Sequence, residues 1–312
     1  MNNFPYTLDN KRYHTFNYYL KNKYNGKVAK VILDGHFTCP NRDGAKGFGG
    51  CTYCSEFGSG DSNVDVSKDI LEQYKLNKEV MDRKWKNDFY IPYFQSFSNT
   101  YGPLEKIKNM LEPFINMDEV AEISIATRCD CLEKDTIEYL NSLTKYKPIW
   151  LELGLQTSNN NTGKLINRGY TFEEFKKALE LISDTNIKVC VHIINGLPNE
   201  TKKDFIKTIK DISHLQFHAI KIHMLHIIKN TKLAKEYTEH PFPVLTRDEY
   251  IETVVEQLRY INKEVVIERL TGDPIKDDLI EPSWVLNKTT ILNDIDKLMV
   301  KLDCYQGDKY EE

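Results

Sequence analysis

The feature of this sequence that most constrains its fold is a repeated order of segments: a short β-branched run, a polar loop and an amphipathic helix. Strands are expected at 29–33, 89–94, 122–127, 149–155, 188–194 and 219–225, with a further strand at 265–268. Strands that alternate with helices form right-handed β-α-β units and a parallel sheet. The pattern allows an open doubly wound sheet or a full or partial barrel, and in both the ligand site lies at the carboxyl ends of the strands.

Helix boundaries carry signals of their own. Thr171 and Glu174 have the spacing of a capping box, which favours the start of a helix there. Pro241 and Pro243 interrupt the chain after the sixth strand, so that stretch is expected to be irregular. Further helices are expected to begin near 67, 103, 133, 201 and 246, and the tail at 286–302 is expected to be a surface helix.

Composition bounds the class of protein. The 312 residues are 40% hydrophobic and 28% charged, which is typical of a globular chain and excludes collagen-like and disordered classes. A net charge of -4 argues against a globally basic nucleic-acid binder. No apolar run approaches the roughly 18–20 residues that a membrane helix needs. The amino-terminal stretch is polar and aromatic and does not resemble a secretory signal, so a cytoplasmic protein is expected.

Three cysteines, Cys39, Cys51 and Cys54, lie close together in a glycine-rich loop after the first expected strand. In a cytoplasmic chain, where thiols stay reduced, such a group indicates a metal site rather than a disulfide framework. A cubane iron–sulfur cluster needs one ligand for each iron, so three cysteines leave one iron open. An open coordination position is what a catalytic cluster requires.

Other interpretations of these cysteines remain open. A structural zinc site would need a fourth ligand, and the nearby His36 precedes the first cysteine. The thiols could also be unrelated buried side chains. A fully cysteine-ligated electron-transfer cluster would have to recruit one of the dispersed cysteines, Cys129, Cys131 or Cys190.

Four further motifs carry a resemblance to a known family: TCPNRDG at 38–44, YFQ at 93–95 with NTY at 99–101, ELGLQT at 152–157 and ERLTGD at 268–273. Together with the cysteine loop they resemble the radical S-adenosylmethionine (SAM) superfamily, and within it the YhcC/YtqA-like family in the branch of the Elongator catalytic subunit. The resemblance covers about 13–284. The chain departs from the common Cys-x3-Cys-x2-Cys spacing, because eleven residues separate Cys39 from Cys51.

The resemblance implies an α/β fold, a partial (β/α)6 TIM-type barrel with an N-terminal helix and a C-terminal α/β extension. We therefore expect a helical extension at 1–27, the radical SAM partial barrel at 28–235 and an extension packed on the barrel at 236–312. The implied cofactors are a 4Fe–4S cluster, held by Cys39, Cys51 and Cys54, and SAM.

Each strand end is then expected to meet a different part of SAM. The resemblance assigns the amino group to polar residues after the second strand, the methionyl part to a glutamine and an arginine, and the adenine to a glycine turn. In this sequence the matching residues are Gln95, Ser96 and Ser98, then Gln156 and Arg168, then Gly196. An arginine suits a carboxylate because its guanidinium is a fixed fork of donors. The alternative for Arg168 is a surface ion pair.

Other polar residues fall near the same edge. His192, within the fifth strand, is expected to point into the barrel, either as a cofactor contact or as a hydrogen-bonded core histidine. His223 and His226 are expected on opposite faces of a regular strand, with one of them toward the site. Arg128 and Asp130 follow the third strand and are expected to border the substrate cavity as catalytic residues.

Two charged segments have less definite roles. The segment 268–273 is either part of the site or an Arg–Glu pair that closes the barrel. The basic residues of the amino-terminal part, interleaved with aromatic residues, form either a patch for an RNA backbone or a solvated helical face. They are Lys11, Arg12, Lys21, Lys23, Lys27 and Lys30.

The sequence therefore predicts a radical SAM enzyme that takes electrons from a one-electron reductant of the flavodoxin or ferredoxin type. The Elongator-like resemblance points to a tRNA wobble-uridine side chain as substrate, with a small metabolite or a peptide as the alternative. A sulfur-insertion enzyme would usually need a second cluster, which the scattered Cys129, Cys131, Cys190 and Cys304 support little. An alternative of another class is a non-catalytic, zinc-stapled RNA-binding protein.

Overall fold

The computed structural model describes residues 2–58 and 64–311. Seven strands form one parallel sheet in the order β1-β2-β3-β4-β5-β6-β8. Their bounds are Val28–Leu33 (β1), Phe89–Phe94 (β2), Ile123–Arg128 (β3), Ile149–Gln156 (β4), Lys188–Asn195 (β5), Ala219–Met224 (β6) and Val266–Arg269 (β8). A small antiparallel pair, β7 (Ile227–Ile228) and β9 (Leu279–Glu281), lies apart from this sheet.

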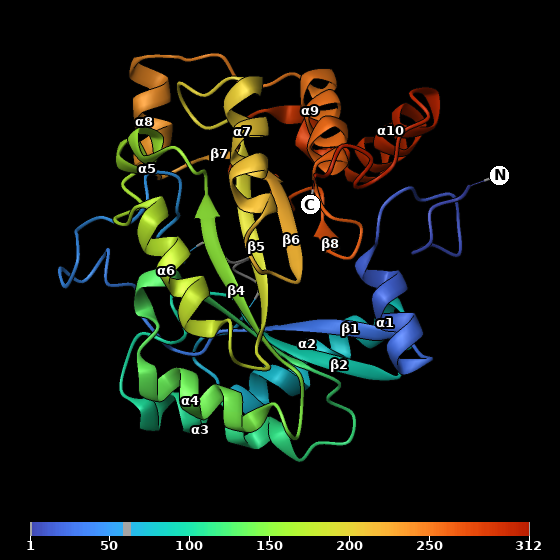
Figure 1. Ribbon diagram of the computed structural model, residues 1–312. Coiled ribbons are helices and arrows are strands. Elements are labelled where there is room, and N and C mark those ends of the chain that lie inside the picture. Colours follow the sequence, from blue (N-terminus) through green and yellow to red (C-terminus); the bar gives the residue numbers. More distant parts are fainter. Residues whose placement is uncertain (1, 59–63, 312) are drawn as a thin grey trace.

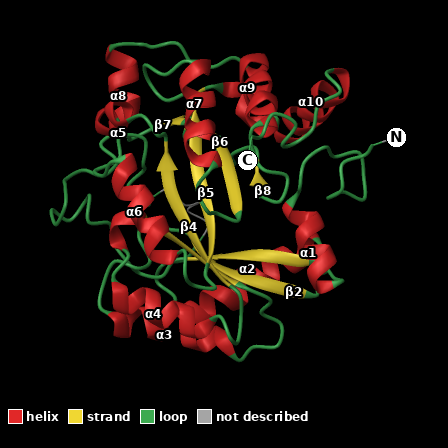
Figure 2. Ribbon diagram, viewed as in Figure 1, coloured by secondary structure: helices red, strands yellow, loops and turns green. Residues whose placement is uncertain are grey.

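Helices connect the strands and cover the outer face of the sheet. They are α1 (Phe16–Tyr24), α2 (Ile70–Lys84), α3 (Leu104–Ile115), α4 (Lys134–Leu143), α5 (Asn160–Leu165), α6 (Phe172–Ile182), α7 (Lys202–Ser213), α8 (Lys232–Glu239), α9 (Arg247–Arg259) and α10 (Lys288–Lys301), with 3-10 turns at Cys129–Cys131 and Ser283–Leu286. Figure 1 shows β1 and β2 running across the view while β4 to β6 stand upright, so the sheet curls into a partial barrel. Figure 2 shows α3, α4, α6 and α7 outside the curl.

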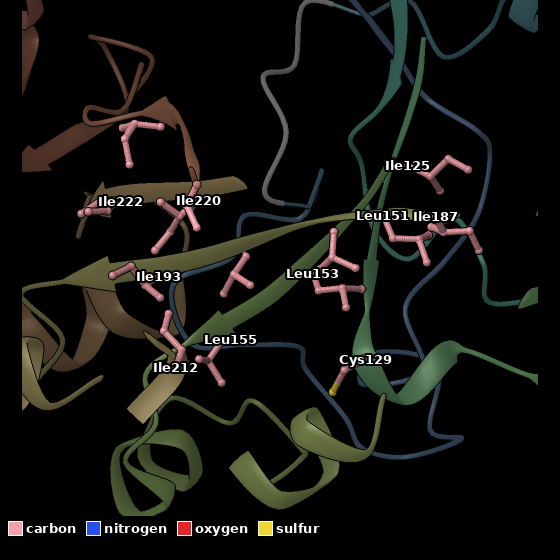
Figure 3. Packing of buried hydrophobic residues seen from close by; sticks show 14 of the residues in the cluster. Ile125, Cys129, Leu151, Leu153, Leu155, Ile187, Ile193, Ile212, Ile220 and Ile222 are labelled. Atoms are coloured by element: carbon pink, nitrogen blue, oxygen red, sulfur yellow. The ribbon is translucent and has the colours of Figure 1, made fainter. Parts of the chain in front are cut away.

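Strand alternation divides the side chains of the sheet between a helix-covered face and a lumen. On β5, Val189, Val191 and Ile193 are buried in the main hydrophobic core, whereas Lys188, Cys190 and His192 occupy the alternate positions. Figure 3 shows buried members of this core, with Leu155 of β4 near Ile193 and Leu151 of β4 near Ile187. The lumen therefore carries a different chemistry from the core behind the sheet.

Two helices predicted from the sequence are confirmed, one that begins after Thr171 and one in the carboxyl-terminal tail. The Thr171 side chain accepts a hydrogen bond from the Glu174 N–H, and Glu174 accepts one from the Thr171 N–H, which is a complete capping box. The tail forms α10, whose Ile291, Ile295 and Met299 are buried.

The architecture confirms a partial barrel and adds a seventh parallel strand to it. β8, expected in the C-terminal extension, pairs with β6 through the α9 crossover. The amino-terminal segment pairs in turn with β8, through the bridge between Thr15 and Ile267. The short elements α5, β7, α8 and β9 were not expected, and α8 lies in the stretch predicted to be irregular. No helix among the described residues combines the length and the apolarity that crossing a membrane demands.

Candidate active site

A cavity of about 380 Å³ opens at the carboxyl ends of the strands. Strand ends from both halves of the sheet contribute to its walls, as the barrel rule requires. Among the lining residues are Tyr93, Gln95, Gln156, His192, Lys221, His223, His226 and Arg269, together with Tyr53 and Cys54 of the cysteine loop. We call this cavity the upper pocket.

The cysteine loop borders the upper pocket and brings its thiols together. The Cys54 N–H donates to the Cys51 carbonyl at 3.0 Å, which folds the loop back on itself. Contact with Cys54 and the nearby Arg128 together lower the pKa of Cys51 to about 7, despite burial. Contact with Cys51 and burial raise the pKa of Cys54, and the nearby Cys39 also raises it. Cys51 and Cys54 are thus in contact, and Cys39 lies near Cys54.

The donor set fits an iron–sulfur cluster better than a structural zinc ion. Soft thiolates suit both, but a structural zinc site is closed by a fourth ligand. The candidate His36 is not available, because its Nε2 contacts the Lys68 carbonyl and the Gln73 amide, each at 3.2 Å.

Gly47 lets the loop approach Asn41, since a side-chain carbon at position 47 would come within 2.3 Å of the Asn41 Oδ1.

Gln156 lies in the upper pocket because the end of β4 is irregular. Its φ of 64° and the register shift between Gly154 and Gln156 turn it out of the strand. A side-chain carbon at position 154 would come within 2.4 Å of the Gln156 amide nitrogen, so the glycine of the ELGLQT motif makes room for this side chain. Gln95, after β2, also lines the upper pocket.

Ser96 and Ser98 do not line the upper pocket. Both are buried; the Ser96 carbonyl accepts from the Asn99 amide at 2.9 Å, and the Ser98 N–H donates to the Thr38 carbonyl at 3.3 Å. Gly196 has a φ of 92°, a conformation that favours glycine, but its neighbours are Leu225 and Leu245. Its assignment to adenine stays a prediction.

Arg168 does not have the environment expected of a carboxylate ligand. Its side chain is fully buried, and its guanidinium donates to backbone carbonyls. The acceptors are Leu155 at 2.7 Å, Thr157 at 2.6 Å and Tyr170 at 2.8 Å. The alternative of a surface ion pair is wrong, because Arg168 is buried and its donors hold the turn after β4. The assignment of Arg168 to SAM stays a prediction.

Arg128 and Asp130 lie beside the cysteine loop and do not line the upper pocket. Arg128 makes a bidentate pair with Asp130, with two N–O distances of 2.9 Å, and donates to the Arg168 carbonyl at 2.9 Å. Lys46 of the cysteine loop approaches the Asp130 carboxylate at 3.2 Å. Arg128 and Asp130 thus brace the loop, and Arg128 lowers the pKa of Cys51; their assignment to the substrate stays a prediction.

The histidines of β6 differ from expectation in another way. His223 and His226 both line the upper pocket. The rule of opposite faces fails because β6 ends at Met224, so alternation does not reach His226. Burial lowers the pKa of His226 to about 4, and that of His223 also falls below its usual value, so both imidazoles are neutral near pH 7.

A buried polar cluster fills the lumen directly beneath the upper pocket, and each of the seven strands supplies one side chain to it. We call it the polar hub; its members are Lys30, Tyr93, Ser124, Glu152, His192, Lys221 and Glu268. Glu152 is its centre, with Lys30 at 2.7 Å and His192 at 2.8 Å, and Lys221 in direct contact. Lys30 also pairs with Glu268 at 2.6 Å.

Charge is balanced inside the polar hub. Burial raises the pKa of Glu152, but Lys221 and Lys30 lower it more, so its pKa lies well below the usual range. Burial and Lys221 lower the pKa of His192, which leaves a neutral imidazole bound to Glu152. His192 thus points into the barrel as predicted. Sequence reasoning missed Lys221; a charged residue inside an otherwise apolar strand is the signal that could have found it.

The amino-terminal basic residues do not form a free patch. Lys11 pairs with Asp296, Arg12 pairs with Asp303, and Lys23 pairs with Glu122. Lys30 belongs to the polar hub. These four residues form neither a patch for an RNA backbone nor a solvated helical face, because carboxylates from distant parts of the chain neutralise them.

Comparisons with known proteins agree with this architecture. The radical SAM superfamily matches residues 39–212, and the radical SAM C-terminal domain matches residues 217–301. YtqA of Bacillus subtilis is 42% identical over 306 residues, covering 98% of this chain and 95% of that protein. The tRNA uridine(34) acetyltransferase of Methanocaldococcus infernus is 28% identical over 178 residues, covering 54% of this chain and 33% of that protein.

Among solved structures, an archaeal Elp3 shares the fold over most of the length of this chain. The Elp3 of Methanocaldococcus infernus, with residues 1–46 deleted, superimposes with a TM-score of 0.67 at 19% sequence identity. The match covers 90% of this chain and 64% of that chain, so the curled sheet is common to both and the Elp3 chain extends beyond it.

Proposed function

Because this chain belongs to the radical SAM superfamily and is an enzyme that uses a 4Fe–4S cluster and SAM, we propose that Cys39, Cys51 and Cys54 hold the cluster at the mouth of the upper pocket. The observation that carries this proposal is the convergence of three thiols at the carboxyl ends of the strands, beside the cavity. The cluster and cofactor supply, when bound, reductive cleavage of the sulfonium to methionine and a 5′-deoxyadenosyl radical.

The residues of the chain then orient the cofactor and the substrate and exclude water. Gln95 and Gln156 offer amide groups from two strand ends and suit the polar groups of SAM. Arg128 places a positive charge near Cys51, and Asp130 holds its guanidinium in position. His192, His223 and Lys221 form the floor of the upper pocket, where the hub fixes Lys221 and His192 for contact with the substrate.

For the substrate we propose a tRNA wobble-uridine side chain. Similarity to a tRNA uridine(34) acetyltransferase over about half of the chain supports it. The neutralised amino-terminal residues do not favour an RNA contact there, so the rim of the upper pocket, which includes Lys229 and Arg269, is the proposed approach. A one-electron reductant of the flavodoxin or ferredoxin type completes the proposal.

Anaerobic reconstitution tests the cluster assignment. Replacing Cys39, Cys51 or Cys54 with Ala is expected to lower bound iron and sulfide and to abolish formation of 5′-deoxyadenosine, because no spare thiolate remains among the three. Cys304→Ser is the matched control, since Cys304 is buried near the carboxyl terminus and away from the loop. Undiminished 5′-deoxyadenosine from the Ala variants would contradict the assignment.

Nucleoside mass spectrometry tests the substrate. Reconstituted enzyme, SAM and a reductant are incubated with tRNA from a strain lacking the homologous gene. The expected result is a mass change at the wobble uridine that requires all three components. Full cleavage of SAM with no change in any tRNA nucleoside would reject the RNA substrate while leaving the enzyme class intact, and would favour a small metabolite or a peptide.

A further inference from the structure

A second cavity, of about 360 Å³, opens at the amino ends of the strands, opposite to the upper pocket. Its walls include Trp150 at the start of β4, Lys188 at the first position of β5, and His218 immediately before β6. We call it the lower cavity. It has no part in the proposed function.

Two layers of side chains separate the lower cavity from the upper pocket. Trp150, Cys190, Ala219 and Val266 form a small apolar cluster. Each of the four precedes a member of the polar hub by two residues on the same strand, as Trp150 precedes Glu152, so they lie one layer lower in the lumen. A molecule in the lower cavity would therefore not contact one in the upper pocket.

Lys188 is the distinctive group of the lower cavity. Its ammonium donates to the Tyr19 hydroxyl at 2.6 Å and lies 4.9 Å from the centre of the Tyr19 ring and 5.1 Å from that of Trp150. Within residues 2–58 and 64–311, no carboxylate oxygen lies within 4.0 Å of it. Burial and the nearby Lys23 lower its pKa to about 8.

The carboxylate beyond Tyr19 does not serve as the missing partner, because other donors occupy it. The fully buried Glu122 accepts from Tyr19 at 2.9 Å, Lys23 at 2.6 Å and Trp150 at 2.7 Å. The Tyr24 hydroxyl donates to it as well, at 2.8 Å. Two ammonium groups thus converge on a region that holds one buried carboxylate.

The other walls of the lower cavity indicate which kind of ligand could pair with Lys188. Leu215, Phe217 and Val265 supply apolar surface around Trp150. The Val189 N–H donates to the His218 Nδ1 at 3.2 Å, so a neutral His218 carries its proton on Nε2 and can donate it. The exposed Glu264, whose carboxylate accepts from the Tyr6 hydroxyl, stands at the rim and disfavours ligands with several negative charges.

We propose that the lower cavity binds a small monocarboxylate with a flat apolar body, its carboxylate paired with Lys188 and its body packed against Trp150. One ammonium without a carboxylate partner calls for one negative charge, and the mainly apolar walls call for an apolar remainder. The volume lies within the range of small-molecule sites, about 300–1,000 Å³.

Calorimetric titration of the cluster-loaded protein with benzoate tests this, with benzamide as the neutral probe of the same shape. Benzoate is expected to bind at least about tenfold more tightly than benzamide, which cannot pair with an ammonium. Lys188→Met is expected to lose about tenfold or more in benzoate affinity, whereas Lys188→Arg keeps most of it. Lys263→Gln, at an exposed lysine next to Glu264, is the matched control and is expected to bind normally.

Three results would overturn the proposal: no saturable benzoate binding, equal affinity for benzoate and benzamide, or unchanged affinity in Lys188→Met. Thermal unfolding of each variant shows whether the fold is kept. If Lys188→Met proves unstable, Lys188→Arg decides, because it retains the charge. Binding that persists in the arginine variant supports the ion pair, and binding that is lost in it points to a purely structural lysine.

Discussion

At the scale of single residues, burial decides what a side chain of the right type can do. Arg168 has the chemistry of a carboxylate ligand, but carbonyls of the turn after β4 use its donors. Arg168→Ala is therefore expected to lower the free energy of unfolding by about 2–4 kcal/mol, because buried acceptors lose a charged donor. Urea unfolding measures this, and SAM affinity of the folded variant is expected to change less than about twofold.

The matched variant for this prediction is Arg168→Lys, which keeps the charge and loses the fork of donors. It is expected to recover only part of the lost stability. Wild-type stability in Arg168→Ala together with a tenfold loss of SAM affinity would support the assignment of Arg168 to the cofactor.

Glu200, in the loop between β5 and α7, is a buried carboxylate with a raised pKa. Its Oε1 accepts from Thr157, its Oε2 is buried with no partner in the described part of the chain, and burial raises its pKa to about 7. A raised carboxylate pKa means that the folded state keeps its proton up to a higher pH than the unfolded state does. Folding stability therefore falls as the pH rises from about 4.5 to 7. Below this window the cost is absent.

Glu200→Gln removes that titration. The variant is expected to be more stable than the wild type by about 3 kcal/mol at pH 8, and the difference is expected to disappear below about pH 4.5. Chemical unfolding across this pH range measures it, with Glu180→Gln, an exposed glutamate, as control. A constant difference at every pH would mean that packing and not ionisation is responsible.

At the scale of elements, a glutamine secures the seventh strand of the sheet. The fully buried Gln306 accepts from the His14 N–H and donates to the carbonyls of Asn262 and Val265, each at 2.8 Å. It thereby ties the amino-terminal segment and the carboxyl-terminal tail to the start of β8.

Gln306→Ala is expected to lower the free energy of unfolding by about 2–3 kcal/mol, because it leaves one buried donor and two acceptors without partners. Hydrogen exchange is expected to accelerate at 13–15 and 262–267 and to stay unchanged in β3 and β4. Gln216→Ala, at an exposed position, is the control. Uniform acceleration over the whole sheet would contradict a local role.

The elements were largely predictable, whereas their side-chain partners were not. Runs of β-branched residues and capping residues such as Thr171 act locally, so strand and helix positions agree with the sequence to within a few residues. Glu152 and Lys30 are far apart in the chain, and no local pattern says that they meet. The cysteine loop was recognisable because its spacing is local, but the position of Arg128 beside it was not predicted.

At the scale of the whole molecule, the polar hub connects the two edge strands of the sheet, β1 and β8, which no backbone hydrogen bonds join in the order of the sheet. The sheet is curled but runs in order from β1 to β8, and Lys30 on the first strand pairs with Glu268 on the last, at 2.6 Å. Glu152, in the middle, binds donors from both halves. Breaking a buried ion pair leaves an uncompensated charge and typically costs about 3–5 kcal/mol.

A double-mutant cycle tests whether the hub acts as one unit. Glu152→Gln and Lys221→Met are each expected to cost about 3–5 kcal/mol, because each leaves the hub with a net charge in the lumen. The double variant restores the balance, since Lys30 and Glu268 still pair. Its cost is therefore expected to fall short of the sum by about 2 kcal/mol or more. Urea unfolding supplies the four free energies.

The exposed pair of Lys134 and Glu138, at 3.8 Å on α4, provides the comparison cycle, for which a coupling of about 0.5 kcal/mol or less is expected. Additive costs at Glu152 and Lys221 would mean that water replaces either partner freely, and that the lumen beneath the upper pocket is wet. Strong coupling would mean that the floor of the pocket is a dry, fixed array of charge, which is what a site that must shield a radical from water requires.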